Sequence, residues 1–308
     1  MTPAPSLIAF TVLSGLGLGL VAWLGLGFGP EAAEAPLFPW FACAGAFVLT
    51  AAGGVASAGH LARPDRAWRA FSQWRSSWLS REACLLVLTA ALFVLYAALW
   101  VIWDVRVWGL GWAVAALALA TVYCTAMIYA QLATVPRWSV PPTPQLFIAF
   151  AAVGGFLGLE ALAALTGGEA HGGRLLLALA LGAGVAIWWQ TQAAGAPRSV
   201  KGSDLASATG LGRMGRVRAF EPPHTGANYL LEEMAFKVGR KRAWQLRWIG
   251  AALGFLAPAV LVVLSWAIGD PVIVLALLVH LAGAMALRWL FFAEAEHVQA
   301  LYYGASAR

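Results

Sequence analysis

Residues 60–82 read HLARPDRAWRAFSQWRSSWLSRE, a basic and tryptophan-rich stretch between two long apolar segments. His60 stands at the end of the first segment, and Glu82 stands at the start of the next. Apolar segments of bilayer length joined by polar bridges are typical of transmembrane helices. The stretch, called the bridge below, therefore predicts a membrane protein with a polar connection at one face of the bilayer.

The composition of the chain favours the same class. Its 308 residues are 61% hydrophobic and only 11% charged. A soluble protein of this length needs far more charge to cover its surface. The net charge of +6 could suggest nucleic-acid binding. In a membrane protein, however, lysine and arginine gathered in cytoplasmic loops explain a positive charge.

Eight apolar segments each approach the roughly 20 residues that a spanning helix needs. They cover residues 7–26, 36–59, 82–103, 109–130, 144–165, 173–189, 247–268 and 271–292. The runs are continuously apolar, which favours helices over the alternating strands of a barrel. We therefore expect an all-α polytopic membrane protein, a single eight-helix anchor domain with one long loop at 195–246. The first segment lacks a basic leader and is expected to be retained.

Basic residues gather on one side of the predicted membrane, in the bridge and in the long loop. The opposite side carries Arg106 and Arg174 among several acidic residues. The positive-inside rule places the basic side in the cytoplasm, and with it both chain termini.

The bridge also has an aromatic face. Ala67, Phe71, Trp74 and Trp78 recur at helical spacing and predict one short helix at the membrane surface. Arginine and tryptophan are common anchors of protein interfaces, so we expect a soluble partner to dock here. The expected docking residues are Arg66, Arg69, Trp74, Arg75 and Trp78. An interfacial helix without a partner is the alternative.

A histidine and a carboxylate at the ends of adjacent helices are suitable proton acceptors for a quinol. Ser80 is a plausible N-cap that puts Glu82 in the first helical turn, which also gives Glu82 a purely structural explanation. We expect further polar and aromatic side chains at the same boundary to complete a pocket over a quinone ring, although an aromatic belt would also explain them. The predicted quinone and proton-transfer residues are His60, Glu82, Arg63, Arg81, Tyr129, Gln131 and Trp138.

The residues that are costly inside the membrane are Glu160, His280 and Arg288, and each is therefore a functional candidate. Arg288 lies near a segment end, so snorkelling to the headgroups is the alternative. A bis-histidine haem b at His280 would need a second histidine at the same depth, and the sequence places none there. A solute transporter would show paired charges in broken helices. The isolated cysteines predict no metal site.

The chain resembles the membrane-anchor subunits of the dimethyl sulfoxide reductase family. The resemblance rests on the HL of 60–61, the SWLSRE of 77–82, the TVPRW of 134–138 and the TP of 143–144. Two later stretches, FEPPHTG at 220–226 and FFAEAEH at 291–297, look more like the sulfite-oxidising branch. The long basic loop departs from the shorter loop of dimethyl sulfoxide reductase anchors and leaves the substrate open.

The resemblance implies an anchor that carries no metal, binds ubiquinone or menaquinone, and holds an iron–sulfur subunit. That subunit in turn carries a molybdopterin catalytic subunit. His60 corresponds to the functional histidine of the family, and Glu82 occupies its acidic position. We expect a bacterial inner-membrane protein that passes electrons from sulfite oxidation to quinone. A quinol-oxidising reductase anchor, a haem b subunit and a transporter are the alternatives.

Overall fold

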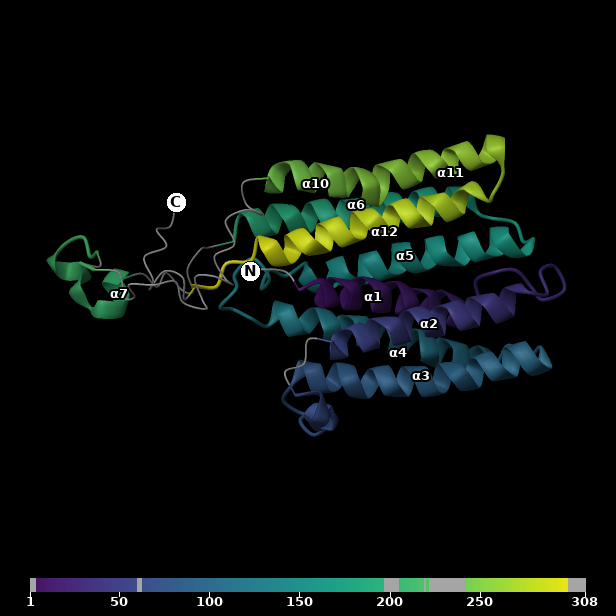
Figure 1. The fold of residues 1–308 in the computed structure, drawn as a ribbon, viewed down its shortest axis with the longest axis horizontal. Helices are drawn as coiled ribbons and strands as arrows, with labels where there is room; N and C mark the ends of the chain where they lie inside the picture. The colour runs from purple at the N-terminus through teal and green to yellow at the C-terminus, as the bar shows by residue number, and fades with distance from the viewer. Residues whose placement is uncertain (1–3, 60–62, 197–204, 219, 222–241, 299–308) are drawn as a thin grey trace.

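The computed structural model of the chain describes residues 4–59, 63–196, 205–218, 220–221 and 242–298. These residues contain eight helices long and apolar enough to span a membrane, and no strand. Figure 1 shows the helices side by side in one elongated bundle, with connections at its two ends. The prediction of an all-α polytopic membrane protein with eight spans is confirmed.

Seven of the described spans are single helices, and the other one is interrupted. The single helices are α1 (Pro5–Gly25), α2 (Phe38–Ala58), α3 (Trp78–Trp103), α4 (Trp108–Ala130), α5 (Thr143–Thr166), α6 (Gly172–Ala194) and α12 (Val272–Ala293). The interrupted span consists of α10 (Ala243–Ala251), a π-helical turn η4 (Ala252–Leu256) and α11 (Ala257–Ile268). A π turn places an extra residue in the helix and often marks a functional position.

The described part of the long loop holds a short helix, α7 (Leu205–Thr209), and a 3-10 turn, η3 (Leu211–Met214). The glycine-rich motif of residues 210–215 forms this turn, and it follows a helix rather than a strand. A dinucleotide-binding loop of the βαβ type follows a strand, so residues 210–215 do not form such a loop.

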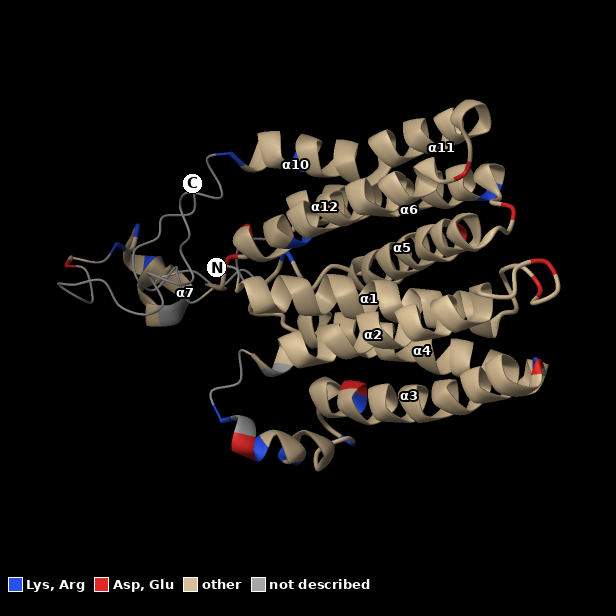
Figure 2. Ribbon diagram, turned by 45° about the vertical axis from the view of Figure 1, so that its right-hand side comes forward, with Lys and Arg blue, Asp and Glu red and all other residues tan. Residues whose placement is uncertain are grey.

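The two ends of the bundle differ in the charged side chains that they carry. We call the end where α1, α3, α5 and α10 begin the basic end. Figure 2 shows Lys and Arg concentrated there and in the bridge, whereas Asp and Glu occupy the connections at the opposite end. At that opposite end Arg106 donates to the carbonyl of Pro30 at 2.9 Å and lies 3.5 Å from Glu31. The uneven distribution of basic residues that the sequence predicts is therefore also present in the folded bundle.

Helix α1 lies at the centre of the bundle and packs against α2, α4, α5 and α12. Glycines make these crossings close. A Cβ at Gly19 would overlap the carbonyl of Ala151, and one at Gly155 would overlap the backbone of Gly19. Gly25 and Gly111 meet in the same way between α1 and α4. Small residues allow such backbone approach in membranes, where van der Waals packing drives helix association.

The start of α3 differs from the prediction. Ser77, not Ser80, is the N-cap: its backbone is extended, and its Oγ accepts a hydrogen bond from the Ser80 N–H at 3.4 Å. Ser80 is already helical, so Glu82 lies beyond the first turn and is not an N-terminal dipole residue. Arg81 holds the preceding turn by donating to the carbonyls of Trp74 and Arg75 at 3.0 and 2.7 Å.

The bridge is not the single short helix that its aromatic spacing predicts. It forms a 3-10 helix, η1 (Pro64–Phe71), followed by turns at residues 72–76, and Trp78 belongs to α3. The serine cap of α3 separates the two elements. Phe71 and Trp74 are about half exposed, at 45% and 55%, so the aromatic side chains of the bridge stay available for contact.

Candidate functional site

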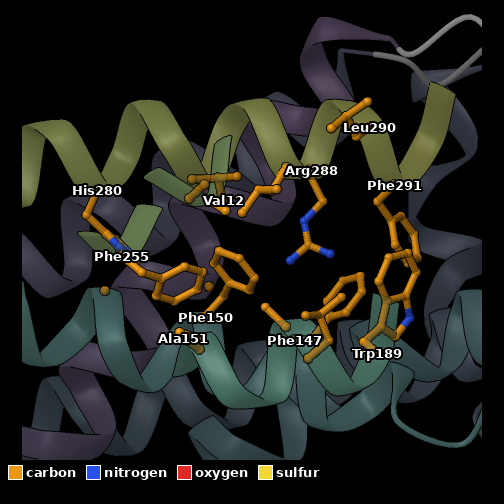
Figure 3. A pocket seen from close by; sticks show the side chains of 18 of the residues that line it. Val12, Phe147, Phe150, Ala151, Trp189, Phe255, His280, Arg288, Leu290 and Phe291 are labelled. Atoms are coloured by element: carbon orange, nitrogen blue, oxygen red, sulfur yellow. The ribbon is translucent and has the colours of Figure 1, made fainter. Parts of the chain in front are cut away.

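A cavity of about 590 Å³ lies within the bundle between α1, α5, α6, the interrupted span and α12. Its walls are mostly apolar, and Figure 3 shows phenylalanine side chains projecting into it from α5 and η4. Ligand pockets in proteins are typically apolar cavities of roughly 300–1,000 Å³ with a few polar groups. The polar or charged residues on these walls are Thr11, Ser14, Thr125, Gln190, Thr191, Arg247, His280, Arg288 and Glu294.

Arg288 is the buried cation of this cavity. Its side chain is only 6% exposed, and its guanidinium carbon lies 3.7 Å from the ring centroid of Phe147. Figure 3 shows the guanidinium pointing from α12 into the space between Phe147 and Phe150. Among the described residues, its Nη1 atom has no hydrogen-bond partner. The snorkelling alternative is therefore wrong for Arg288, because the side chain turns into the protein and not to the headgroups.

His280 lies deeper along the same helix and is 1% exposed. Its Nδ1 is 2.6 Å from the carbonyl oxygen of Gly254 in η4. A carbonyl only accepts, so Nδ1 carries the proton and Nε2 of the neutral ring is a bare acceptor. Pro258, four residues later, has no N–H, so the Gly254 carbonyl receives no α-helical hydrogen bond from that position.

Glu82 reaches the cavity through a threonine. Its carboxyl is buried, with the residue 5% exposed, and it is hydrogen-bonded to the hydroxyl of Thr125, which lines the cavity. The same hydroxyl lies 3.1 Å from the carbonyl of Thr121. One hydroxyl proton serves only one acceptor, so both contacts are hydrogen bonds when Glu82 is protonated and donates to Thr125. Glu82 is thus placed to hold a proton beside the cavity wall.

Tyr129 and Trp138 belong to an aromatic cluster behind Phe147. The two rings meet edge to face with centroids 5.3 Å apart, and Tyr129 stacks on Phe147 at 5.6 Å. Trp138 is fixed by a 2.8 Å hydrogen bond from its Nε1 to the Phe291 carbonyl. These residues therefore pack the wall that carries the partner ring of Arg288.

The structure separates the other predicted site residues from the cavity. Gln131 is exposed, and Arg63 is exposed and paired with Asp65 at 3.1 Å. Arg81 donates a hydrogen bond to the Arg75 carbonyl in the bridge turn, and its guanidinium carbon lies 4.3 Å from the ring centroid of Trp78. His60 lies outside the described residues. Glu82, Tyr129 and Trp138 do not line the cavity themselves, but each contacts a residue that does, namely Thr125, Phe147 or Phe291. His60 stays a prediction.

An ion-pair cluster lies at the basic end of the cavity. Glu294 accepts from Arg137 at 2.8 Å and from Arg247 at 2.7 Å. These residues join the connection after α4, the middle of α10 and the C-cap of α12. Burial lowers the pKa of Arg137, and the Glu294 carboxylate opposes that effect. Neither ion pair is predictable from the sequence, because the members of each are far apart in the chain.

Glu160 lies at the opposite end of the bundle. Its carboxylate accepts from the His171 N–H at 2.6 Å and lies 3.5 Å from the His171 Nδ1. His171 is the N-cap residue of α6, so Glu160 ties α5 to the start of α6. It does not line the cavity. Over the described residues, His, Cys, Asp and Glu form no group of three or more that would suit a metal ion.

The predicted docking residues of the bridge lie on its surface. Arg66, Arg69, Trp74 and Arg75 are exposed, whereas Trp78 is half-buried at the start of α3. The arginines lie over neighbouring tryptophans: Arg69 is 5.5 Å from the ring of Trp68, and Arg75 is 5.4 Å from that of Trp74. The bridge therefore presents a cationic, aromatic surface at the basic end.

Comparison with known proteins identifies the family. The sequence model of the DMSO reductase anchor subunit (DmsC) family matches residues 2–294. The chain is also 32% identical over 331 aligned positions to the C subunit of the sulfite dehydrogenase of Allochromatium vinosum, and the alignment covers 100% of both proteins. The resemblance read from the bridge and the TVPRW stretch is thereby confirmed. This chain belongs to the DMSO reductase anchor subunit family of membrane anchors.

Proposed function

We propose that this chain is the quinone-reacting anchor of a three-subunit molybdopterin oxidoreductase. In this role it passes electrons between an iron–sulfur partner and the quinone pool. The observation that carries the proposal is the buried Glu82 carboxyl, linked through Thr125 to the wall of an apolar cavity. A quinone is an apolar ring with polar oxygens, and its reduction requires a group that handles protons close to the ring.

Reduction of one quinone to quinol consumes two electrons and two protons, and the electrons arrive from the iron–sulfur partner. Glu82 lies where it can exchange one proton with the ring through the Thr125 hydroxyl. His60, which the sequence puts at the end of the second span, is the proposed second proton group.

Sulfite is the proposed electron source. The name of the full-length relative supports this choice, and so do the stretches at 220–226 and 291–297. Sulfite oxidation to sulfate at the molybdopterin subunit releases the two electrons that quinone reduction takes up. The family description favours a second candidate, a quinol-oxidising anchor of a DMSO reductase-type enzyme. In either case, the basic end faces the cytoplasm of a bacterial inner membrane in our proposal.

Isolation of the intact complex tests the proposal. The tagged chain is extracted in a mild detergent, and its partners are analysed for molybdenum, iron and visible absorption. We expect larger subunits with molybdenum and non-haem iron, and sulfite-dependent reduction of added quinone. A haem band on this subunit alone, or a single chain without partners, would favour the cytochrome b or the transporter alternative.

His60→Ala is expected to leave assembly intact and to abolish quinone-linked turnover, because a proton group of the reaction is lost. The measurement compares sulfite-driven quinone reduction with sulfite-driven reduction of a soluble dye that takes electrons directly from the partner subunits. The dye rate should stay at the wild-type value. Normal quinone reduction by His60→Ala would remove this residue from the proposed site.

Charge reversal of the bridge is expected to release the partner. The triple variant Arg66→Glu, Arg69→Glu and Arg75→Glu replaces exposed positive charge with negative charge on the proposed docking surface. We expect the co-purified iron–sulfur subunit to fall at least tenfold, a change of about 1.4 kcal/mol in binding. Arg174→Glu, exposed at the opposite end, is the matched control and should retain the partner. Equal retention by both variants would argue against docking at the bridge.

A further inference from the structure

We propose that the cavity binds the reduced, hydroquinone form of the quinone ring in preference to the oxidised form, with Arg288 and His280 as its polar contacts. This inference rests on the proposed function, since it takes the quinone as the reactant. It names the polar contacts of the ring inside the same cavity that Thr125 lines and assigns that cavity a redox preference.

The first polar contact is the guanidinium of Arg288, a hydrogen-bond donor without an acceptor among the described residues. Arg288 is nine-tenths or more buried, it points into the cavity, and its Nη1 has no partner among the described residues. A buried donor without a partner is costly, and arginine has no acceptor atom. The ligand must therefore bring an oxygen lone pair to Arg288. Both a quinone carbonyl and a hydroquinone hydroxyl meet that requirement.

The second contact distinguishes the two forms. The hydrogen bond of His280 Nδ1 to the Gly254 carbonyl fixes the tautomer, so Nε2 presents only a lone pair. A quinone carbonyl has no proton for this lone pair and would repel it. A hydroquinone hydroxyl donates to it. The η4 turn, through the Gly254 carbonyl, thus makes His280 selective for the reduced ring.

The two contacts lie at opposite ends of one aromatic surface. His280 and Arg288 are eight residues apart on α12, about 12 Å along the helix axis. The ring of Phe150 lies between them: its centroid is 6.2 Å from the His280 ring and 5.9 Å from the Arg288 guanidinium carbon. A flat ring lying against Phe150 has its para oxygens directed toward the two polar groups. Gly15 of α1 also lines the cavity and leaves open space there.

The preference has a consequence for electron transfer. A site that binds the reduced ring more tightly than the oxidised ring makes the bound quinone a stronger oxidant than the pool, by linkage. Electrons from the partner would then flow more readily to the bound ring. In the proposed sulfite-oxidising direction, this aids the reaction catalysed by the complex.

Binding of a defined quinone pair tests the inference. The full chain is placed in nanodiscs of quinone-free lipid and titrated with ubiquinol and ubiquinone that carry short isoprenoid tails. We expect wild type to bind ubiquinol at least tenfold more tightly, the value of about one hydrogen bond to a buried ring nitrogen. His280→Phe should bring the ratio to about one, and Arg288→Met should weaken both forms by roughly tenfold or more. Equal wild-type affinities, or an unchanged ratio in His280→Phe, would overturn the proposal.

A pair of glycine variants keeps the test independent of folding at the polar sites. Gly15→Leu fills open cavity space, whereas Gly184→Leu adds the same side chain to an exposed position of α6 outside the cavity, also without contacts within 4 Å. Gly15→Leu should lose binding of both forms, and Gly184→Leu should bind as wild type. Normal binding by Gly15→Leu would place the ligand elsewhere.

The outcomes separate this inference from the proposed function. A wild-type complex that reduces quinone but shows no redox preference in binding would overturn only the inference. A complex that neither binds quinone nor reduces it would overturn the proposed function as well.

Discussion

Glu82→Gln is expected to reduce quinone-linked turnover of the complex by roughly 10²- to 10⁴-fold, the usual contribution of a positioned proton-transfer group. Glutamine keeps the shape of the side chain and a hydrogen bond to Thr125, but it cannot release or take up the proton. The loss should therefore appear in the rate and not in assembly. Sulfite-driven quinone reduction by the purified complex is the measurement, with a soluble dye acceptor for comparison.

Glu160→Gln is the matched control for this variant. Both glutamates are buried in spans, at 5% and 2% exposure, but Glu160 lies at the opposite end with His171 and does not line the cavity. The control should assemble and reduce quinone at close to the wild-type rate. If Glu82→Gln kept full quinone reduction, or if both variants lost it equally, the assignment of Glu82 as the proton group would fail.

Gly19→Val is expected to prevent correct assembly of the bundle. A Cβ at Gly19 overlaps the backbone of Ala151 in α5, and backbone atoms cannot move aside as a flexible side chain can. Overpacking typically costs about 1–3 kcal/mol or more, and here α1 would have to move away from several neighbours at once. The folded fraction after extraction, followed by size-exclusion chromatography and thermal unfolding, should fall strongly.

Gly15→Val makes the same substitution one helical turn earlier in α1. A Cβ at Gly15 has no atom within 4 Å, so this variant should fold and unfold as wild type does. Equal loss of both variants would indicate a general intolerance of α1 to valine. Normal folding of Gly19→Val would show that the α1–α5 crossing tolerates a wider spacing than the structure has.

The candidate site was partly predictable from the chain. Arg288 and His280 stood out because charged and ionisable groups inside spans are costly, and Glu82 stood out through the bridge motif. Their arrangement was not predictable. Phe147, which stacks under Arg288, and Gly254, which fixes the tautomer of His280, lie on other helices. Contacts between distant parts of the chain leave no local pattern to read.

The aromatic residues show the same limit. Tyr129 and Trp138 could be assigned either to a quinone pocket or to an aromatic belt, because both predict rings at a membrane boundary. The structure buries both rings in a cluster against Phe147 and Phe291. Gln131, predicted beside them, is the C-cap of α4 and is exposed.

The sequence by itself determined the class of protein, the eight spans, the basic end and the family motifs. Those features depend on hydropathy and charge, which each segment carries locally. Only the tertiary structure decided that α1 is the central helix, that Arg288 faces a cavity, and that Glu82 reaches this cavity through Thr125. A span that is apolar on all sides has no amphipathic face to show which side packs inward. That choice depends on glycines and side-chain shapes meeting across helices.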